Sequence, residues 1–294
     1  MLQMASVIGH SFLYRLLQAV VEEEHRLGAH LLRLQREEMI RERARVPELE
    51  YVFKHELTRE AAYNGLLRKQ RRVVHQQVAE ALERLFPDRV EEQLGLLAYH
   101  WELAGDAQKA VGYLLRAGQR DVRQFANQEA IAHFSRGLAL LESLPDGPER
   151  VQLEFALQMG LGAPLIATKG YGAPEVGRAW GRALELSQQM GDPPQLWPAR
   201  SAIFQYYLVR AEHGTALEVA RQMADAGERA GEALLFPFPR GTLGISCFYL
   251  GDHEPARLHL EATVARYDPE KHHTSAFVYG QDVGVLYLSY LAWV

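Results

Sequence analysis

The chain has 294 residues, of which 48% are hydrophobic and 23% are charged, and its formal net charge is −5. This length suffices for one large or two ordinary domains of a soluble globular protein. A single cysteine, Cys247, excludes an intramolecular disulfide and a cysteine-cluster metal site. The longest apolar run, Val283–Val294, is shorter than the ~20 residues of a membrane span. We therefore expect a cytoplasmic chain without a membrane partner.

The first 75 residues have a different rhythm from the remainder of the chain. Helical patterns over 2–7, 12–21 and 24–38 are followed by two extended segments, 39–43 and 50–54, which a turn at Pro47 joins. The run Tyr51-Val52-Phe53 supports the second segment as a strand. Three helices followed by a β-hairpin predict a small winged-helix-like module over residues 1–75.

Two helices are predicted next, over 56–67 and 68–86, and the second one opens with clustered positive charge. In the first helix the inward residues are expected to be Leu57, Ala61, Leu66 and Leu67. Cations at the start of the second helix suit either phosphate groups or a protein partner, while a solvated helix face is the simpler alternative. These cations are Arg68, Lys69, Arg71 and Arg72.

From residue 76 onward the main signal is a pair of small residues twelve positions apart. Two antiparallel helices approach closely only where side chains are small, so each pair marks the crossing of a helical hairpin. Large apolar residues flank each pair and are expected to pack against the neighbouring hairpin. The predicted packing residues are Leu94, Leu97, Ala98, Trp101, Ala110, Leu114, Ala117, Gly118, Ala130, Phe134, Leu243, Gly244, Ala256 and Leu260.

These crossings lie in a nearly continuous series of predicted helices, interrupted by Gly-Asp turns and by one loop that begins near Pro164. The fold class is therefore all-α: a superhelix of tetratricopeptide-like hairpins over 76–294, preceded by the winged-helix-like module. The last helix, 276–294, is apolar and lacks a partner, so we expect a fragment that is truncated at its C-terminus. The predicted helices cover 91–104, 107–125, 127–144, 149–161, 175–190, 195–210, 214–230, 239–250, 254–267 and 276–294.

Aromatic residues recur at helix-packing positions within the repeats. We expect most of them in the core and some on the concave face, where helical repeat proteins bind their partners. They are Trp101, Phe125, Phe134, Tyr206, Tyr207, Phe248 and Tyr249.

No pattern in the sequence supports catalysis. A phosphate-binding P-loop requires a Gly-Lys dipeptide, and no lysine of this chain follows a glycine. Among the 12 histidines, the pair His25 and His30 and the pair His272 and His273 miss the spacing of three or four at which helical residues share a metal. A hydrogen-bonded structural role is expected for His75. We predict no catalytic, cofactor-binding or metal-binding residues.

Part of the sequence resembles a known family. Residues 53–82 are similar to the region after the ATPase core in bacterial AAA- or STAND-type predicted ATPases, which are linked to class III adenylate/guanylate cyclases or act as transcriptional regulators. In that family an NTPase leads into a winged helix and then into tetratricopeptide repeats. The P-loop and the cyclase carboxylates have no counterpart here, so the resemblance implies neither activity for this chain. The matching segments are Phe53–Tyr63, Leu66-Leu67, Arg71, His75–Leu82, 88–144 and 241–268.

Two functions of different class follow from these observations. The first is a non-catalytic interaction and regulatory scaffold, which binds a protein or peptide on its concave face or binds the NTPase or output domain of the same parent protein. The second is a transcriptional regulator whose winged helix binds DNA. Residues 1–75 hold 13 Lys and Arg against 10 Asp and Glu, a balance of +3, while the remainder holds 19 against 27, a balance of −8. Because DNA binding needs several clustered cations, this balance favours the scaffold.

Overall fold

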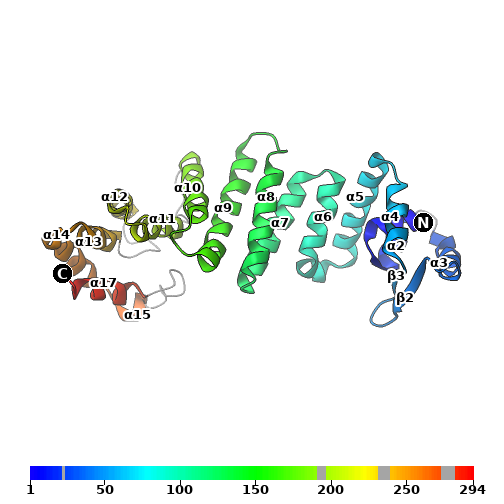
Figure 1. Ribbon diagram of the computed structural model, residues 1–294, viewed down its shortest axis with the longest axis horizontal. Coiled ribbons are helices and arrows are strands. Elements are labelled where there is room, and N and C mark those ends of the chain that lie inside the picture. The colour runs from blue at the N-terminus through cyan, green and yellow to red at the C-terminus, as the bar shows by residue number, and fades with distance from the viewer. Residues whose placement is uncertain (22–23, 191–196, 231–238, 273–281) are drawn as a thin grey trace. The chain divides into compact units, whose positions relative to one another are not determined.

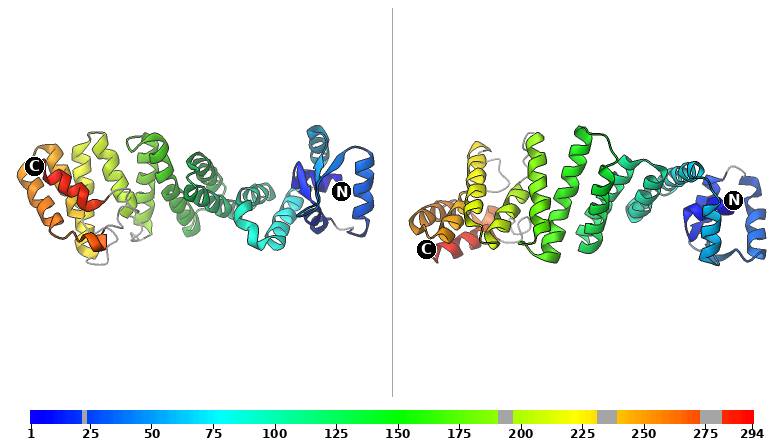
Figure 2. Two further views of the ribbon diagram at one scale, coloured as in Figure 1. Left: turned by 90° about the horizontal axis from the view of Figure 1, so that it is seen from below. Right: turned by 45° about the horizontal axis from the view of Figure 1, so that its top comes forward.

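The computed structural model describes residues 1–21, 24–190, 197–230, 239–272 and 282–294. These residues are mostly helical, with one small sheet, and within each unit several helices pack on the next helix along the chain (Figures 1 and 2). The predicted all-α class is confirmed. The chain divides into two compact units: the first comprises Met1–Gln124 and Ser135–Asp146, and the second comprises Phe125–Phe134 and Gly147–Val294. The predicted boundary at residue 75 falls inside a helix of the first unit, and the division into 1–75 and 76–294 stays a prediction.

The first unit begins with three α-helices and the predicted hairpin, with one further strand, β1, after the first helix, and it continues with helices only. Its elements are α1 (Leu2–Ile8), β1 (Ser11–Leu13), α2 (Tyr14–Val20), η1 (Glu24–Arg26), α3 (Leu27–Arg36), β2 (Ile40–Ala44), β3 (Glu50–Phe53), α4 (Glu56–Asn64), α5 (Arg68–Leu85), η2 (Pro87–Gln93), α6 (Leu94–Ala104) and α7 (Ala107–Arg123).

A three-stranded antiparallel sheet in the order β1-β3-β2 lies within these elements. The predicted hairpin of β2 and β3 is confirmed. The prediction that residues 12 and 13 begin a helix is wrong, because Ser11–Leu13 pairs with β3 instead. Phe12 lies opposite Tyr51, with 5.9 Å between the ring centroids, and is buried. The local pattern of this segment favours a helix, but the cross-strand aromatic contact stabilises the extended conformation.

Helix α4 buries less than the sequence predicts. Leu57 is 78% exposed and Leu67 is 70% exposed, so the expectation that both point inward is wrong, whereas Leu66 is buried. The helix ends at Asn64, and Gly65 starts a turn, so the Leu66-Leu67 pair does not continue the helical phase of Leu57. Helix α5 contributes the core residues instead, with Val74, Val78 and Leu82 among them.

Helix α8 (Asn127–Leu141) contributes residues to both units, and the remaining helices belong to the second unit. Consecutive helices from α9 to α14 pack on one another, and α17 packs on α13 and α14. They are α9 (Pro148–Lys169), α10 (Pro174–Gln189), α11 (Trp197–Val209), α12 (His213–Ala230), α13 (Pro239–Leu250), α14 (His253–Val264), α15 (Pro269–His272) and α17 (Val283–Leu291).

The predicted loop at Pro164 is wrong, because α9 continues through this proline to Lys169. A proline inside a helix removes one backbone hydrogen bond and crowds the preceding turn. Leu157, Leu161 and Leu165 are nevertheless all buried, so apolar packing on both sides of the proline holds the helix together. Residues 276–281 of the predicted helix 276–294 lie outside the described residues, and so does His273.

Packing in the second unit uses glycines in a way that the sequence analysis did not anticipate. A Cβ atom added to Gly160 would lie 2.6 Å from the ring of Phe134, and one added to Gly177 would lie 2.5 Å from the ring of Tyr206. The same relation holds for three further pairs. In each case an aromatic ring occupies the space that a missing Cβ leaves open. These pairs are Gly162 with Trp180, Gly241 with Tyr287, and Gly284 with Tyr267.

Across the described residues, no helix combines the length and the apolar character that a membrane crossing requires.

Candidate functional site

The strongest candidate is a cluster of aromatic rings in the second unit, which we call the aromatic surface. The ring of Phe248 lies at its centre, 5.3 Å from Tyr249, 5.6 Å from Tyr290 and 6.2 Å from Trp293. His213 stacks on Tyr249 at 5.1 Å. These rings come from α12, α13 and the end of α17 with Trp293 just beyond it, and His253 at the start of α14 joins them, so four segments build one cluster. The members of the aromatic surface are His213, Phe248, Tyr249, His253, Tyr290 and Trp293.

Much of this cluster faces solvent. The side chain of Trp293 is 65% exposed and that of Tyr249 is 42% exposed. On the neighbouring turns of α17, Val285 and Leu288 are exposed as well, while Tyr287 is buried in the core. The aromatic residues of the repeats were expected mostly in the core and in part on the concave face, and Tyr249 is one of those that are exposed. Apolar spacing alone does not distinguish a packed helix face from an exposed one.

A hydrogen bond joins two side chains of the aromatic surface. The hydroxyls of Tyr249 and Tyr290 lie 3.1 Å apart, so one donates to the other. Burial, and then this hydrogen bond, raise the pKa of Tyr290 well above its usual range, so the phenol stays neutral. A surface of aromatic rings with exposed Trp and Tyr is chemically suited to binding, since these residues dominate the energetics of protein interfaces.

A buried histidine pair joins α5 to α6 in the first unit. The Nδ1 atoms of His75 and His100 lie 2.8 Å apart, and the hydroxyl of Tyr63 lies 3.1 Å from Nε2 of His75. One imidazole must donate to the bare nitrogen of the other, so the accepting ring is neutral. Burial lowers the pKa of His75 to about 4 and that of His100 to about 3. The expected hydrogen-bonded structural role of His75 is what the structure shows.

This pair does not amount to a metal site. Nε2 of His100 is buried and has no hydrogen-bond partner. The two Nδ1 atoms are already hydrogen-bonded to each other, and among the described residues no third metal-ligating side chain joins them. In the described ranges, histidine, cysteine and carboxylate side chains do not gather in groups of three or more. The pair therefore contributes to packing.

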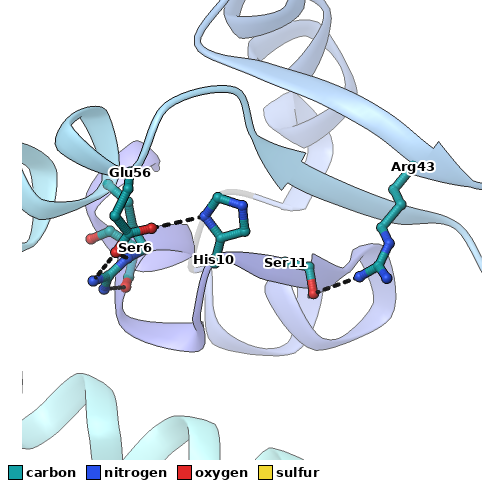
Figure 3. A network of polar contacts seen from close by, with 6 residues as sticks. Ser6, His10, Ser11, Arg43 and Glu56 are labelled. Carbon is teal, nitrogen blue, oxygen red and sulfur yellow. Dashed lines mark hydrogen bonds and ion pairs between the residues drawn. The ribbon is translucent and has the colours of Figure 1, made fainter.

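A polar network links α4 to the first strand (Figure 3). Nδ1 of His10 lies 2.8 Å from Oε2 of Glu56, and Nε of Arg59 donates to Oε1 of the same carboxylate at 2.6 Å. Ser11, the adjacent residue, accepts from Arg43 at 3.4 Å and points away from His10 in Figure 3. A histidine and a carboxylate without a nucleophile in reach do not form a catalytic triad. The network fastens α4 to β1.

The predicted basic group divides into two parts. Arg71 is half-buried: its Nε donates to the Leu66 carbonyl at 3.0 Å, and its guanidinium lies 4.4 Å from the centre of the Tyr63 ring. Arg68, Lys69 and Arg72 are exposed. Arg71 thus holds the turn before α5, and the other three remain available to a partner.

Two of the predicted crossings can be followed in the structure, where α6 packs on α7 and α13 packs on α14. Ala98 and Ala110 are buried where α6 packs on α7, and a Cβ atom on Gly244 would lie 2.7 Å from Leu260 and 3.2 Å from the carbonyl of Ala256. Leu243 is half-buried against the core of the second unit. Phe125, one of the aromatic residues expected mostly in the core and in part on the concave face, is exposed. The other predicted packing residues are buried: Leu94, Leu97, Trp101, Leu114, Ala117, Gly118, Ala130, Phe134, Ala256 and Leu260.

Comparisons with known proteins complete the description. No protein-family model matches the chain. Over 258 residues it is 28% identical to an uncharacterized protein of Rhizobium meliloti (strain 1021); the match covers 85% of this chain and 24% of that protein. The chain thus spans about a quarter of the length of this curated relative.

Among solved structures, the chain is similar to a Signal Transduction ATPase with Numerous Domains (STAND) protein with a tetratricopeptide repeat sensor from Pyrococcus horikoshii. The TM-score is 0.43 and the identity is 13%, and the match covers 90% of this chain and 49% of that chain. A TM-score below 0.5 does not establish a common fold. The function is therefore argued from the residues of this chain.

Proposed function

We propose that this chain is a non-catalytic interaction and regulatory scaffold, in which packed helical hairpins present a binding surface. The observation that carries the proposal is the aromatic surface, with Trp293 and Tyr249 open to solvent over a cluster of packed rings. Contiguous exposed apolar surface of this kind marks an interaction site in soluble proteins. The partner is a protein or peptide, or the NTPase or output domain of a longer parent protein.

The proposal extends to the kind of parent protein. Residues 53–82 resemble the region that follows the NTPase in ATP-dependent bacterial signalling proteins, including the cyclase-linked type. In the structure these residues form the end of β3, α4 and most of α5, which connect the small sheet to the first hairpin. This position suits a winged-helix-like module that leads into tetratricopeptide-like repeats. We assign the chain to the repeat portion of such a protein.

DNA binding by the first unit is less well supported. Arg43 on β2 and Arg45 just after it are already paired with Glu50 and Glu42, at 3.2 and 2.6 Å. Arg33 on α3 is paired in the same way with Glu37. Cations that neutralise neighbouring carboxylates contribute little to phosphate binding. The scaffold therefore stays the proposed function.

The experiment begins with the natural partner. The chain is used to retrieve proteins from a cytosolic extract of its source cell, and each retrieved protein is purified and its affinity for the chain is measured by calorimetry. We expect Trp293→Ala combined with Tyr249→Ala to weaken binding at least ~10-fold, which is ~1.4 kcal/mol. The matched control is Leu57→Ala, which removes an equally exposed apolar side chain from the first unit and should change the affinity less than about twofold.

Two results would contradict the proposal. The first is that no purified protein binds the native chain, or that binding is the same in the aromatic variant and in the control. The second is that the isolated chain binds ATP with micromolar affinity and hydrolyses it, with both activities lost on a single substitution.

A further inference from the structure

The start of α5 carries an exposed stripe that combines positive charge with apolar side chains. Lys69, Arg72 and Val73 lie three and four positions apart, so they share one face of the helix, and all three are exposed. Leu67 and Arg68 stand at its N-terminal end and are exposed too. We call these five residues the basic stripe.

The charge of this stripe is not balanced by its surroundings in the sequence. Between Glu60 and Glu80 there is no acidic residue, while four cations occur there. Helix α5 has no acidic residue in its first turn. Cations at a helix N-terminus face the positive end of the helix dipole, which disfavours them by ~0.3–1 kcal/mol each. The stripe is therefore a site of electrostatic repulsion that an anionic partner would relieve.

The three exposed cations also lack polar partners in the described parts of the chain. Within the described parts of the chain, Arg68, Lys69 and Arg72 have neither a hydrogen-bond partner nor an ion-pair partner. The fourth cation, Arg71, differs, because backbone carbonyls and the ring of Tyr63 engage it. Arg71 thereby fixes the turn that presents the other three, so the stripe projects from a well-anchored helix end.

The apolar residues in the stripe point to the class of partner. Leu67 is 70% exposed and Val73 is 49% exposed, and they flank the three cations in the sequence. A nucleic-acid backbone offers phosphates but no apolar side chains to cover them. An acidic protein segment with apolar residues at helical spacing complements both parts of the stripe.

We propose that the basic stripe of α5 docks an acidic, amphipathic protein segment. This inference rests on the proposed scaffold function and adds a second contact, made by the first unit, to the one at the aromatic surface. Carboxylates of the partner would pair with Arg68, Lys69 and Arg72, and its apolar residues would cover Leu67 and Val73.

The test uses a fluorescent synthetic peptide with Glu and Leu at helical spacing, and its affinity for the full chain is measured by anisotropy. Replacing Arg68, Lys69 and Arg72 together by Gln should weaken binding about tenfold, or ~1.4 kcal/mol. The control replaces Arg36, Arg41 and Arg84 by Gln. These are three exposed cations outside the stripe, without partners in the described chain, and the same change in net charge should alter the affinity less than about twofold.

Further arms separate the contributions and the alternatives. Leu67→Ser with Val73→Gln should weaken peptide binding several-fold, and a peptide with Gln in place of Glu should bind the native chain far more weakly. Both sets of α5 variants should keep the native melting temperature, because fewer cations at a helix N-terminus cost no stability. A folded native chain that does not bind the peptide, equal loss in stripe and control variants, or tighter binding of duplex DNA would overturn the inference. Partner binding at Trp293 is measured separately, so the scaffold proposal survives a failure here.

Discussion

Two regions of the molecule bring helices together by different means. At the α6–α7 crossing of the first unit, Ala98 and Ala110 are both buried, and small side chains meet small side chains. In the second unit, Gly162 and Gly177 instead face the rings of Trp180 and Tyr206. Small residues inside packed helices thus correspond to two packing arrangements. One shortens the distance between helices, and the other makes room for a large side chain.

The difference has an energetic consequence. Glycine inside a helix costs up to ~1 kcal/mol relative to alanine. We call the space beside such a glycine, where a Cβ atom is missing, the glycine notch. A ring that fills this notch offsets the cost, since an aromatic side chain buries a large apolar area in one place. Glycine-aromatic crossings should therefore tolerate fewer substitutions than alanine crossings. The following predictions test this contrast, from the largest expected effect to the smallest.

The largest effect is expected for Gly162→Ala. The added methyl would overlap the indole of Trp180, which is buried and has little space to move. We expect a loss of ~3 kcal/mol in the free energy of unfolding, at the upper end of overpacking effects. Gly181→Ala on α10 is the control: no atom lies within 4 Å of its added Cβ, and it should stabilise by ~0.5–1 kcal/mol. Chemical denaturation measures both, and equal shifts would show that the ring does not occupy the notch.

Acid should affect the first unit through the histidine pair. Unfolded histidines bind protons near pH 6.5, while the pKa values of His75 and His100 in the folded chain are about 4 and about 3. The unfolded state therefore takes up more protons as the pH falls below 6.5. Stability is full above this pH, and each histidine removes up to ~1.4 kcal/mol one pH unit below it.

The measurement is hydrogen exchange of α5 and α6 between pH 7 and pH 5, corrected for intrinsic rates. Replacing His75 and His100 together by Leu should make their stability nearly independent of pH in this range. A pH dependence that persists in this double variant would assign the effect to other groups.

The crossing of α6 and α7 at Ala110 should lose stability when a larger side chain is introduced. Ala110→Leu places an isobutyl group between α6 and α7, and we expect a loss of ~1–3 kcal/mol. Ala107→Leu, three residues earlier, enters an open hollow lined by Ser143 and Leu144, so its effect should be much smaller. Thermal unfolding compares the two variants, and equal shifts would show that Ala110 does not lie at the crossing.

The smallest effect distinguishes two turns with the same Gly-Asp sequence. Gly105 and Gly251 both adopt a positive φ, at 88° and 83°, which glycine accommodates without strain. Asp106 caps α7, because its Oδ1 accepts from the backbone nitrogen of Lys109 at 3.0 Å, whereas Asp252 makes no such bond. Asp106→Ala should cost ~1 kcal/mol and Asp252→Ala only a few tenths. Equal costs by chemical denaturation would contradict this difference in capping.

Local signals account for what could be predicted from the sequence. The β-hairpin around Pro47, the Gly-Asp turns and the small residues at crossings are all encoded within short windows. The strand Ser11–Leu13 was missed because its pairing partner, β3, lies far away in the sequence. The rings opposite the glycines were missed because the phase of one helix against another is not a local property.

The candidate site was predictable only in part. Phe248 and Tyr249 stand out as aromatic residues at helical spacing, yet spacing does not separate a buried ring from an exposed one. The same limit applies to Leu57 and Leu67, which look like core residues and lie on the surface. The basic group was visible in the sequence, but the distinct role of Arg71 depends on carbonyls that only the folded turn presents.

The most direct test of the central contrast is a double-mutant cycle on Gly162 and Trp180. Gly162→Ala, Trp180→Leu and the double variant are compared with the native chain by chemical denaturation. If the indole fills the glycine notch, Gly162→Ala should cost ~3 kcal/mol in the native chain and less than ~1 kcal/mol beside Trp180→Leu. Strictly additive costs would contradict the proposal that the second unit is held together by aromatic rings seated on glycines.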